Sequence, residues 1–120
     1  MTAQEVAQAF AELCKKGQLE EAGRRYWSDD IVSMEPMTGE MALLKGRQAV
    51  EAKGAWWYAN HEIHSTRVEG PYVHGQQFVL RFTIDVTPKD GKRQTMDEVG
   101  LYTVQGDKVV EERFFFGSMV

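Results

Sequence analysis

The last quarter of the chain, residues 92–116, carries the pattern that most restricts the fold. Its sequence, KRQTMDEVGLYTVQGDKVVEERFFF, is rich in the β-branched and aromatic residues that favour strands. The segment Gln105-Gly106-Asp107 interrupts this run with residues that are typical of turns. The pattern therefore predicts two long antiparallel strands joined by a tight turn.

The length of that turn decides which side chains share a face of the hairpin. A two-residue turn pairs Gln105 with Lys108 and would place Glu98 on the odd-numbered face of the last strand. A three-residue loop pairs Val104 with Lys108 and would place Glu98 on the even-numbered face, with Val110, Glu112, Phe114 and Phe116. We favour the three-residue loop, because the even-numbered face is the more apolar and a one-residue slip would expose it.

The segments before the hairpin predict three helices and then strands. Helical periodicity marks residues 2–16, 18–27 and 47–60, and a short strand at 31–35 is followed by an apolar loop at 36–46. Residues 61–73 predict another strand, and strict alternation over 76–87 predicts one that is buried on a single face. Helices followed by an antiparallel meander indicate one α+β domain over residues 1–120, with the helices on one face of a curved sheet.

Composition excludes several classes of function. The chain has 120 residues and a net charge of −4, and it lacks the basic stripe that a nucleic-acid partner requires. We find no signal peptide and no apolar run of about 20 residues that could span a membrane. The single cysteine, Cys14, cannot form an internal disulfide. We therefore expect a cytoplasmic protein that binds neither nucleic acid nor membrane.

The order of these parts resembles the nuclear transport factor 2-like superfamily, which includes SnoaL-like polyketide cyclases and ketosteroid isomerases. The resemblance covers nearly the whole chain and is carried by four stretches, namely residues 17–19, 27–36, 45–50 and the final hairpin at 99–104 with 108–110. It implies a cystatin-like cone, in which three N-terminal helices pack in the concave face of a curved mixed or antiparallel sheet. It does not fix an activity, because this fold hosts enzymes, binders and transport adaptors.

Three positions bear on the ketosteroid isomerase mechanism. The resemblance places the isomerase base at Glu35, so an acid is retained there. The position of the oxyanion-binding tyrosine falls on Phe10, and that of the oxyanion-binding aspartate falls on or near Gly100. Because neither of these residues can donate a side-chain hydrogen bond, we do not expect steroid isomerisation by that mechanism.

Resemblance to the SnoaL-like cyclases instead implies an acid or base with a histidine on the later strands. The candidates are Glu98, Glu112 and His64. Glu98 and Glu112 are expected one cross-strand pair apart, which would raise the pKa of one of them and suit it to acid–base catalysis near neutral pH. The competing interpretations are a salt bridge from these acids to Arg81 or Arg113, and a structural role for His64.

We expect a mostly apolar pocket that accepts a small hydrophobic ligand bearing a carbonyl group, with no cofactor and no metal. The aromatic residues that could line it, besides serving as core, are Tyr26, Trp27, Trp57, Phe82, Tyr102 and Phe114. The alternative is a non-catalytic module that binds a ligand or partner through the 36–46 loop or the outer sheet face. Apolar residues on that outer face, Val79, Val99 and Leu101, predict a homodimer.

Overall fold

The structure, a computed structural model, describes residues 1–116, which form three helices and a six-stranded sheet. The helices are α1 (Ala3–Lys15), α2 (Leu19–Tyr26) and α3 (Arg47–Ala59). The strands are β1 (Trp27–Met34), β2 (Leu43–Lys45), β3 (His61–His74), β4 (Gln77–Pro88), β5 (Gln94–Gln105) and β6 (Lys108–Phe116). The α+β class is confirmed.

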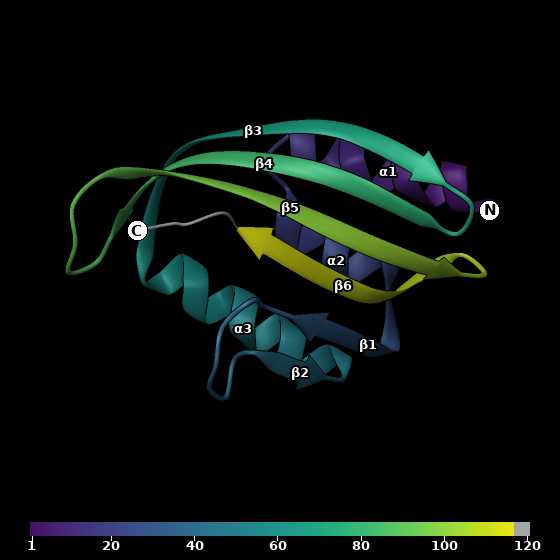
Figure 1. The fold of residues 1–120 in the computed structure, drawn as a ribbon, viewed down its shortest axis with the longest axis horizontal. Coiled ribbons are helices and arrows are strands. Elements are labelled where there is room, and N and C mark those ends of the chain that lie inside the picture. The colour runs from purple at the N-terminus through teal and green to yellow at the C-terminus, as the bar shows by residue number, and fades with distance from the viewer. Residues whose placement is uncertain (117–120) are drawn as a thin grey trace.

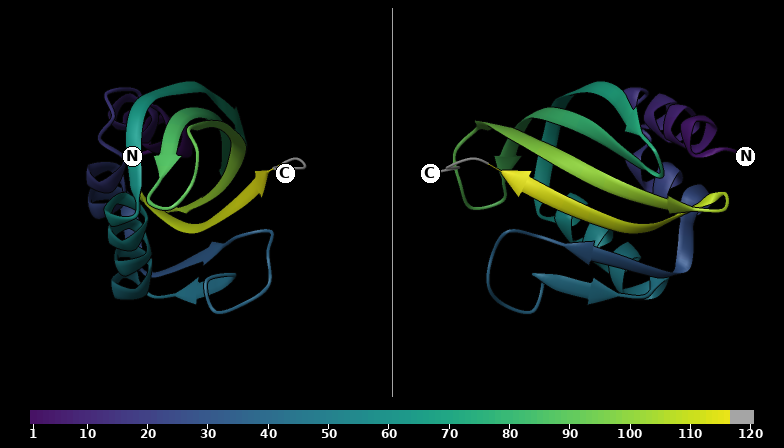
Figure 2. Two further views of the ribbon diagram at one scale, coloured as in Figure 1. Left: turned by 90° about the vertical axis from the view of Figure 1, so that its left-hand side faces the viewer. Right: turned by 45° about the vertical axis from the view of Figure 1, so that its right-hand side comes forward.

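The sheet has the strand order β2-β1-β6-β5-β4-β3. Neighbouring strands are antiparallel except for β1 and β6, which run parallel, so the sheet is mixed. Figures 1 and 2 show the long strands β3 to β6 curling over α1 and α2, while α3 lies against β1 and β2. The helices therefore occupy the concave side of a cone, as expected.

One face of β4 supplies much of the core. Because successive side chains of a strand point to opposite faces, every second residue of β4 faces the helices. Five such residues are at most 5% exposed, namely Phe78, Leu80, Phe82, Ile84 and Val86. Phe10 of α1 packs among them, with its ring centroid 5.8 Å from that of Phe78 and 5.0 Å from that of Tyr102. The burial of β4 on a single face, predicted from the alternation over residues 76–87, is confirmed.

Both ends of α1 follow the sequence signals. Thr2 Oγ1 accepts a 3.1 Å hydrogen bond from the backbone N–H of Glu5, and Glu5 Oε1 accepts a 2.8 Å bond from the N–H of Thr2. This reciprocal capping box satisfies two backbone donors that a helix start leaves free. At the other end Gly17 has a φ of +77°, a conformation that glycine adopts without strain.

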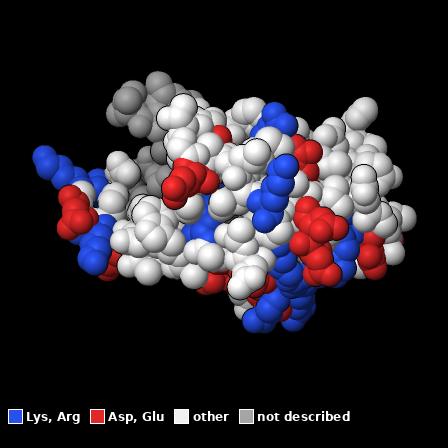
Figure 3. Space-filling model, turned by 90° about the horizontal axis from the view of Figure 1, so that it is seen from below, with Lys and Arg blue, Asp and Glu red and all other residues white. Residues whose placement is uncertain are grey.

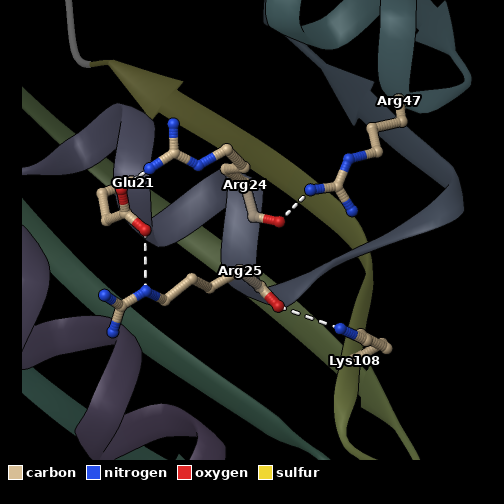
Figure 4. A network of polar contacts seen from close by, with 5 residues as sticks. All are labelled: Glu21, Arg24, Arg25, Arg47 and Lys108. Atoms are coloured by element: carbon tan, nitrogen blue, oxygen red, sulfur yellow. Dashed lines mark hydrogen bonds and ion pairs between the residues drawn. The ribbon is translucent and has the colours of Figure 1, made fainter.

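The C-terminal end of α2 is held by two cations from distant elements (Figure 4). Arg47, the first residue of α3, donates to the carbonyl oxygen of Arg24 and, over 2.9 Å, to that of Trp27. Lys108, the first residue of β6, donates a 2.9 Å hydrogen bond to the carbonyl oxygen of Arg25. Helix C-termini leave carbonyl groups unpaired and carry partial negative charge, so these cations stabilise the end of α2 and join it to α3 and β6.

The turn between β5 and β6 is shorter than predicted. Gln105 pairs with Lys108 and Val104 pairs with Val109, so the loop has two residues and the predicted three-residue loop is wrong. The register then shifts by one residue, because Thr103 pairs with Glu111. The extra residue on β6 is a β-bulge, which bends a strand and adds to its twist.

This bulge restores the predicted facing of the hairpin. Beyond it Tyr102 pairs with Glu112, Gly100 with Phe114, and Glu98 with Phe116. Residues paired across antiparallel strands share a face. Glu98 therefore lies on the even-numbered face of β6, as the apolar content of that strand predicted, although the added residue lies in the strand and not in the turn.

Two segments expected to be irregular contribute strands instead. Ser28, Asp29 and Asp30 are residue types typical of turns, but they lie within β1, where the pairing with β6 shifts register between Trp27 and Val32. The predicted 36–46 loop contains β2, which pairs with residues 32–34 of β1. The start of β1 is polar, as turns usually are, and β2 has only three residues, too few to show a strand period. Neither segment could therefore be recognised as a strand from its local sequence.

Charges of both signs are distributed over the surface. On the face shown in Figure 3, lysine and arginine side chains lie among aspartate and glutamate side chains. Arg81 pairs with Asp97 at 2.6 Å and Arg93 pairs with Asp85 at 2.7 Å. None of the helices within residues 1–116 is long and apolar enough to cross a membrane.

Candidate functional site

Glu112 lies inside the cone, where β6 pairs with β1. Its residue exposure is 3%, and its two carboxyl oxygens accept hydrogen bonds from Trp27 Nε1 at 3.0 Å and Ser33 Oγ at 2.8 Å. Ser33 is its partner in the parallel β1–β6 ladder, so their side chains share a face. Burial raises the pKa of Glu112 above its ordinary value, although Lys53 and these two hydrogen bonds act in the opposite direction.

Lys53 enters the same interior from α3. Its Nζ donates hydrogen bonds to Ser33 Oγ at 2.6 Å and to Glu35 Oε1 at 3.1 Å, and it lies 5.2 Å from the centroid of the Phe114 ring. Sequence reasoning missed this residue. Lys53 lies three residues after the buried Val50, a spacing that places both on one face of a helix and could have revealed it.

Glu98 is an acid without a partner. It is partly buried on the inner face of β5, opposite Phe82 on β4 and Phe116 on β6. Within residues 1–116 its carboxyl group makes neither a hydrogen bond nor an ion pair. Burial, followed by repulsion from Glu35, raises its pKa to about 7, with Lys53 lowering it and Glu112 adding a smaller increase.

Glu35 completes the cluster from the end of β1. One carboxyl oxygen pairs with Lys53, and both side chains are about 15% exposed or less. The other oxygen, Oε2, is buried without a hydrogen-bond partner in the part of the chain that the structure describes. Buried polar atoms in proteins are nearly always satisfied, so the open valence of Glu35 Oε2 favours a polar group from outside the chain.

The two hairpin acids are farther apart than expected. The Gly100–Phe114 pair lies between the pairs that contain Glu98 and Glu112, so the acids are two same-face pairs apart and not one. The difference follows from the short turn and the bulge. It also explains why Glu35 acts more strongly than Glu112 on the pKa of Glu98.

The salt-bridge interpretation of the hairpin acids is wrong. Arg81 pairs with Asp97, and Arg113 pairs with Glu111 at 3.1 Å. These residues belong to the alternate positions of β4, β5 and β6, which face away from the helices. Glu98 and Glu112 are therefore left without an arginine partner within residues 1–116, and Lys53 supplies the positive charge of the interior.

His64 lies outside this cluster. Its side chain is exposed, and its Nε2 is 2.8 Å from the hydroxyl oxygen of Thr87. Thr87 belongs to the face of β4 opposite to the one that contacts Glu98. The β3–β4 pairing shifts register between Ile63 and Ser65, so simple alternation could not place His64. The structure does not bring this histidine to the acids.

Four of the six candidate aromatic residues border the acids. Trp27 donates to Glu112, Phe114 lies beneath Lys53, Phe82 pairs with Glu98, and Tyr102 pairs with Glu112. The other two make different contacts. The ring of Tyr26 packs 6.4 Å from that of Phe10, and the ring of Trp57 stacks 4.4 Å from that of His61.

Two open hollows lie elsewhere on the surface. One, of about 540 Å³, follows α1 and reaches Pro71, and the other, of about 610 Å³, lies between the start of α1, Pro71 and Gln76. Neither is lined by Glu35, Glu98 or Glu112. The acids are therefore distinguished by their burial and by the unpaired Glu35 Oε2, and not by the shape of these hollows.

Comparison with known proteins agrees with this architecture. A family model described as SnoaL-like domain matches residues 1–116. The chain belongs to the SnoaL-like family. A crystal structure from Mesorhizobium loti, named for likeness to SnoaL polyketide cyclases, is 54% identical over 97% of this chain and 100% of its own, with a TM-score of 0.94. No protein of curated function matches the sequence.

More distant structures share the fold alone. An NTF2-like protein from Burkholderia xenovorans is 19% identical, with a TM-score of 0.75 over 99% of this chain and 93% of its own. A protein from Catenulispora acidiphila with a ketosteroid isomerase-like fold, in complex with trimethylamine, is 15% identical, with a TM-score of 0.73 over 95% of this chain and 86% of its own. The SnoaL-like family includes cyclases and isomerases, and its fold is that of this chain.

Proposed function

We propose that this member of the SnoaL-like family binds a small, mostly apolar ligand with a carbonyl group, and that Glu98 transfers a proton at the carbon next to that carbonyl. The observation that carries the proposal is a partly buried carboxyl without a partner in the described chain and with a pKa of about 7. A base whose pKa lies near the working pH is both populated and strong enough to act.

The proposed step conserves atoms and charge. The Glu98 carboxylate takes a proton from the α-carbon of the ligand, and the C–H electron pair becomes the new C=C bond. The carbonyl π pair moves onto oxygen and forms an enolate. The same carboxyl group then returns the proton to the opposite face of that carbon, or to the γ-carbon of a conjugated dienolate, which gives isomerisation. Alternatively, the enolate carbon attacks a second carbonyl carbon and the resulting alkoxide takes the proton from Glu98, which gives ring closure.

The other charged groups support this step without carrying it. Lys53 and Glu35 form an ion pair, so their charges largely offset each other near Glu98. Glu112 accepts hydrogen bonds from Trp27 and Ser33, and burial raises its pKa above the ordinary value. Because Glu98 is partly buried, its charge is less well solvated than in water and its basicity is increased.

The test is deuterium exchange at the α-carbon of 2-tetralone, an apolar cyclic ketone, followed by NMR in D₂O. We expect the protein to accelerate exchange, with a rate that rises with pH and levels off above about 7, the pKa of Glu98. Glu98→Gln should lower the rate at least about 100-fold, the usual contribution of a general base. Titration of ¹³C-labelled glutamate side chains measures the same pKa directly.

The matched control is Glu40→Gln, since Glu40 is an exposed acid in the loop between β1 and β2. It should leave the exchange rate unchanged. A Glu98→Gln protein that exchanges 2-tetralone as fast as the unchanged protein would disprove the role of Glu98, and so would a Glu98 carboxyl that titrates near 4.5, its ordinary value.

A second candidate function is binding of a partner without catalysis. Met37, in the loop after β1, and Leu43, the first residue of β2, are 49% and 51% exposed. Exposed apolar side chains of this size are found at interaction surfaces. This candidate predicts that Glu98→Gln has no effect on any turnover, whereas Met37→Ser and Leu43→Ser abolish binding of the partner.

We also propose that the outer face of the sheet binds a second copy of the chain. Phe115 on β6 is 47% exposed on this face and pairs across the hairpin with the partly exposed Val99. Leu101, also partly exposed, lies two residues farther along β5 on the same face. Sedimentation equilibrium should give the mass of a dimer, and Leu101→Asp should give that of a monomer. A monomer in the unchanged protein would disprove this assembly.

The single cysteine is consistent with a reducing compartment, and we propose the cytoplasm. Cys14 is 2% exposed in the core, and burial raises the pKa of its thiol to about 12. A buried, protonated thiol is unreactive and packs as a small apolar group. Fractionation of cells should recover the protein with cytoplasmic markers.

A further inference from the structure

One carboxyl oxygen of Glu35 is enclosed by the protein without a hydrogen-bond donor. Oε1 accepts a 3.1 Å hydrogen bond from Lys53 Nζ, whereas Oε2 is buried and has no partner among residues 1–116. Leaving a buried acceptor unpaired is costly, so such atoms are rare in proteins. A polar group from outside the chain is one way to satisfy this oxygen, and a neighbouring side chain that gains a proton is another.

Glu98 is a neighbouring side chain of that kind. A carboxylate only accepts hydrogen bonds, whereas a protonated carboxyl group also donates one. Burial is the largest cause that raises the pKa of Glu98 to about 7, and the charge of Glu35 is the next. Lys53 lowers this pKa, and Glu112 raises it by less than Glu35 does. Below neutral pH, Glu98 therefore carries a proton close to the carboxyl group of Glu35.

The sheet places these two carboxyl groups within reach of each other. The parallel pairing of β1 with β6 ends at Met34 and Arg113. The next residues, Glu35 and Phe114, therefore lie side by side, and the β5 partner of Phe114 is one same-face position from Glu98. With strands about 4.8 Å apart and same-face residues roughly 7 Å apart, the two backbones lie roughly 12 Å from each other. Two extended glutamate side chains on the concave face of a sheet span that distance.

Both acids also point to the same side of the sheet. Side chains two residues apart in a strand share a face. Ser33 donates to the buried Glu112, so Glu35, two residues after Ser33, faces the interior. Glu98 pairs with Phe116, which is four residues from Glu112 and lies on the same face of β6. The two carboxyl groups therefore converge inside the cone.

The other groups that face this interior are less suited to donate to Oε2. The cross-strand neighbours of Glu98 on β4 and β6 are phenylalanines, and both oxygens of Glu112 already accept hydrogen bonds. Lys53 on α3 is paired with the other oxygen of Glu35. Burial holds the pKa of Tyr102 on β5 well above its ordinary value, and Glu35 acts on it less than Glu112 or Glu98 does. Glu98 is therefore the best placed donor.

We propose that Glu35 and Glu98 hold one proton between them, so that the protonated Glu98 carboxyl donates a hydrogen bond to Glu35 Oε2 and joins the end of β1 to β5. Loss of this proton leaves two carboxylates, which repel each other, so the contact opens as the pH rises. The basic form of Glu98 exists only in the open state, and Glu35 thus sets the pH at which the acid becomes a base. The inference goes beyond the proposed function, because it requires neither a ligand nor turnover.

The test is ¹³C NMR titration of the glutamate carboxyl groups, with signals assigned through bonds. In the unchanged protein the signals of Glu35 and Glu98 should move together at a pH of about 7, because loss of one shared proton changes both groups. In mixtures of H₂O and D₂O, both carboxyl carbons should show a deuterium isotope shift below that pH and neither should show one above it.

Glu35→Gln is the variant that separates the two acids. The amide has no charge and donates to the ionised carboxyl, so the pKa of Glu98 should fall, with a proton dissociation constant at least about tenfold larger. Glu112→Gln makes the same change at the other neighbouring acid and should have a smaller effect, because Glu112 is the weakest of the charges that act on Glu98. Glu40→Gln, at an exposed position, should have none.

The outcomes distinguish this proposal from the proposed function. An isotope shift on Glu98 alone, a Glu35 signal that stays constant through the transition, or a Glu98 titration unchanged in Glu35→Gln would overturn the shared proton, and Glu98 could still act as a base. Joint titration without any 2-tetralone exchange would support the shared proton and remove the proposed reaction. A Glu98 carboxyl that titrates near 4.5 would overturn both.

Discussion

Lys53 donates a 2.6 Å hydrogen bond to the hydroxyl oxygen of Ser33, and this contact joins α3 to β1 inside the cone. Because the Ser33 oxygen accepts from an ammonium group, its own proton is directed to the other neighbour, Glu112, at 2.8 Å. The indole of Trp27 donates to the second oxygen of Glu112. One chain of hydrogen bonds therefore runs from Lys53 on α3 through Ser33 to Glu112 on β6 and on to Trp27.

Removal of Lys53 should destabilise the fold and make Glu98 a still weaker acid. Lys53→Met leaves the Glu35 carboxylate and the Ser33 hydroxyl without their donor, and breaking such a largely buried ion pair costs about 3 kcal/mol. The pKa of Glu98 should rise above about 7, since Lys53 lowers it in the unchanged protein. Urea unfolding and glutamate NMR titration measure the two effects.

Lys89→Met is the control for Lys53→Met, because it removes the same charge from an exposed position next to the β4–β5 turn. It should change the free energy of unfolding by less than about 0.5 kcal/mol. The double variant Lys53→Met with Glu35→Met should recover part of the lost stability, since the uncompensated carboxylate is then absent. Equal effects of the two lysine variants would contradict the assigned role of Lys53.

Glu98 should make the fold less stable as the pH rises. Its pKa is raised from 4.5 to about 7 in the folded protein, so the folded state binds this proton more tightly than the unfolded state does. The stabilising contribution is complete below 4.5 and is lost as the pH rises through about 7. The difference between these pKa values corresponds to a loss of up to about 3 kcal/mol.

Glu98→Gln removes this titration, so its stability relative to the unchanged protein should increase between pH 4 and pH 8 by up to about 3 kcal/mol. Urea unfolding at a series of pH values measures the difference, and the exposed Glu40→Gln provides the baseline. A constant difference between Glu98→Gln and the unchanged protein across this range would mean that the Glu98 carboxyl is not perturbed.

The parts of the fold that could be predicted are those with a strong local period. The inward face of β4 followed from strict alternation, and the face of α1 from helical spacing, because both elements are buried on one side only. The facing of the hairpin acids followed for a related reason. The apolar residues of β6 determine which of its faces is buried, whether the register is set by a longer turn or by a β-bulge.

The features that could not be predicted depend on single residues, which produce no repeating pattern in the sequence. The β-bulge in β6 adds one residue within a strand, and its energy differs little from that of a longer turn. Lys53 is charged, so sequence alone favours solvent, and its burial becomes reasonable only once Glu35 and Ser33 lie beside it. His64 lies at a register shift, where alternation carries no information.

Two helical glycines should respond in opposite ways to alanine. A Cβ atom on Gly23 in α2 would lie 2.6 Å from the ring of Trp27, whereas one on Gly54 in α3 has no atom within 4 Å. Gly54→Ala should stabilise the fold by about 0.5–1 kcal/mol through helix propensity. Gly23→Ala should destabilise it by about 1–3 kcal/mol, because Trp27 must move and its hydrogen bond to Glu112 is disturbed.

Urea unfolding of the two variants under the same conditions measures this contrast. Each protein serves as the control for the other, since both carry the same substitution inside a helix. If both are stabilised by the same amount, Trp27 is free to move away from Gly23 at no cost, and its contact with Glu112 does not fix its position.

Arg47 should stabilise the fold through the end of α2 (Figure 4). Arg47→Met removes the donors to the carbonyl oxygens of Arg24 and Trp27, and the loss should be about 1–2 kcal/mol in the free energy of unfolding. The stability of Arg47→Lys should lie between those of Arg47→Met and the unchanged protein, because an ammonium group keeps the charge but cannot direct two donors in a fixed fork. Arg67→Met is the control, since Arg67 is 76% exposed and should contribute less than about 0.5 kcal/mol. An Arg47→Met protein no less stable than Arg67→Met would show that water satisfies these carbonyls equally well, and that α2 is held by the packing of its apolar face alone.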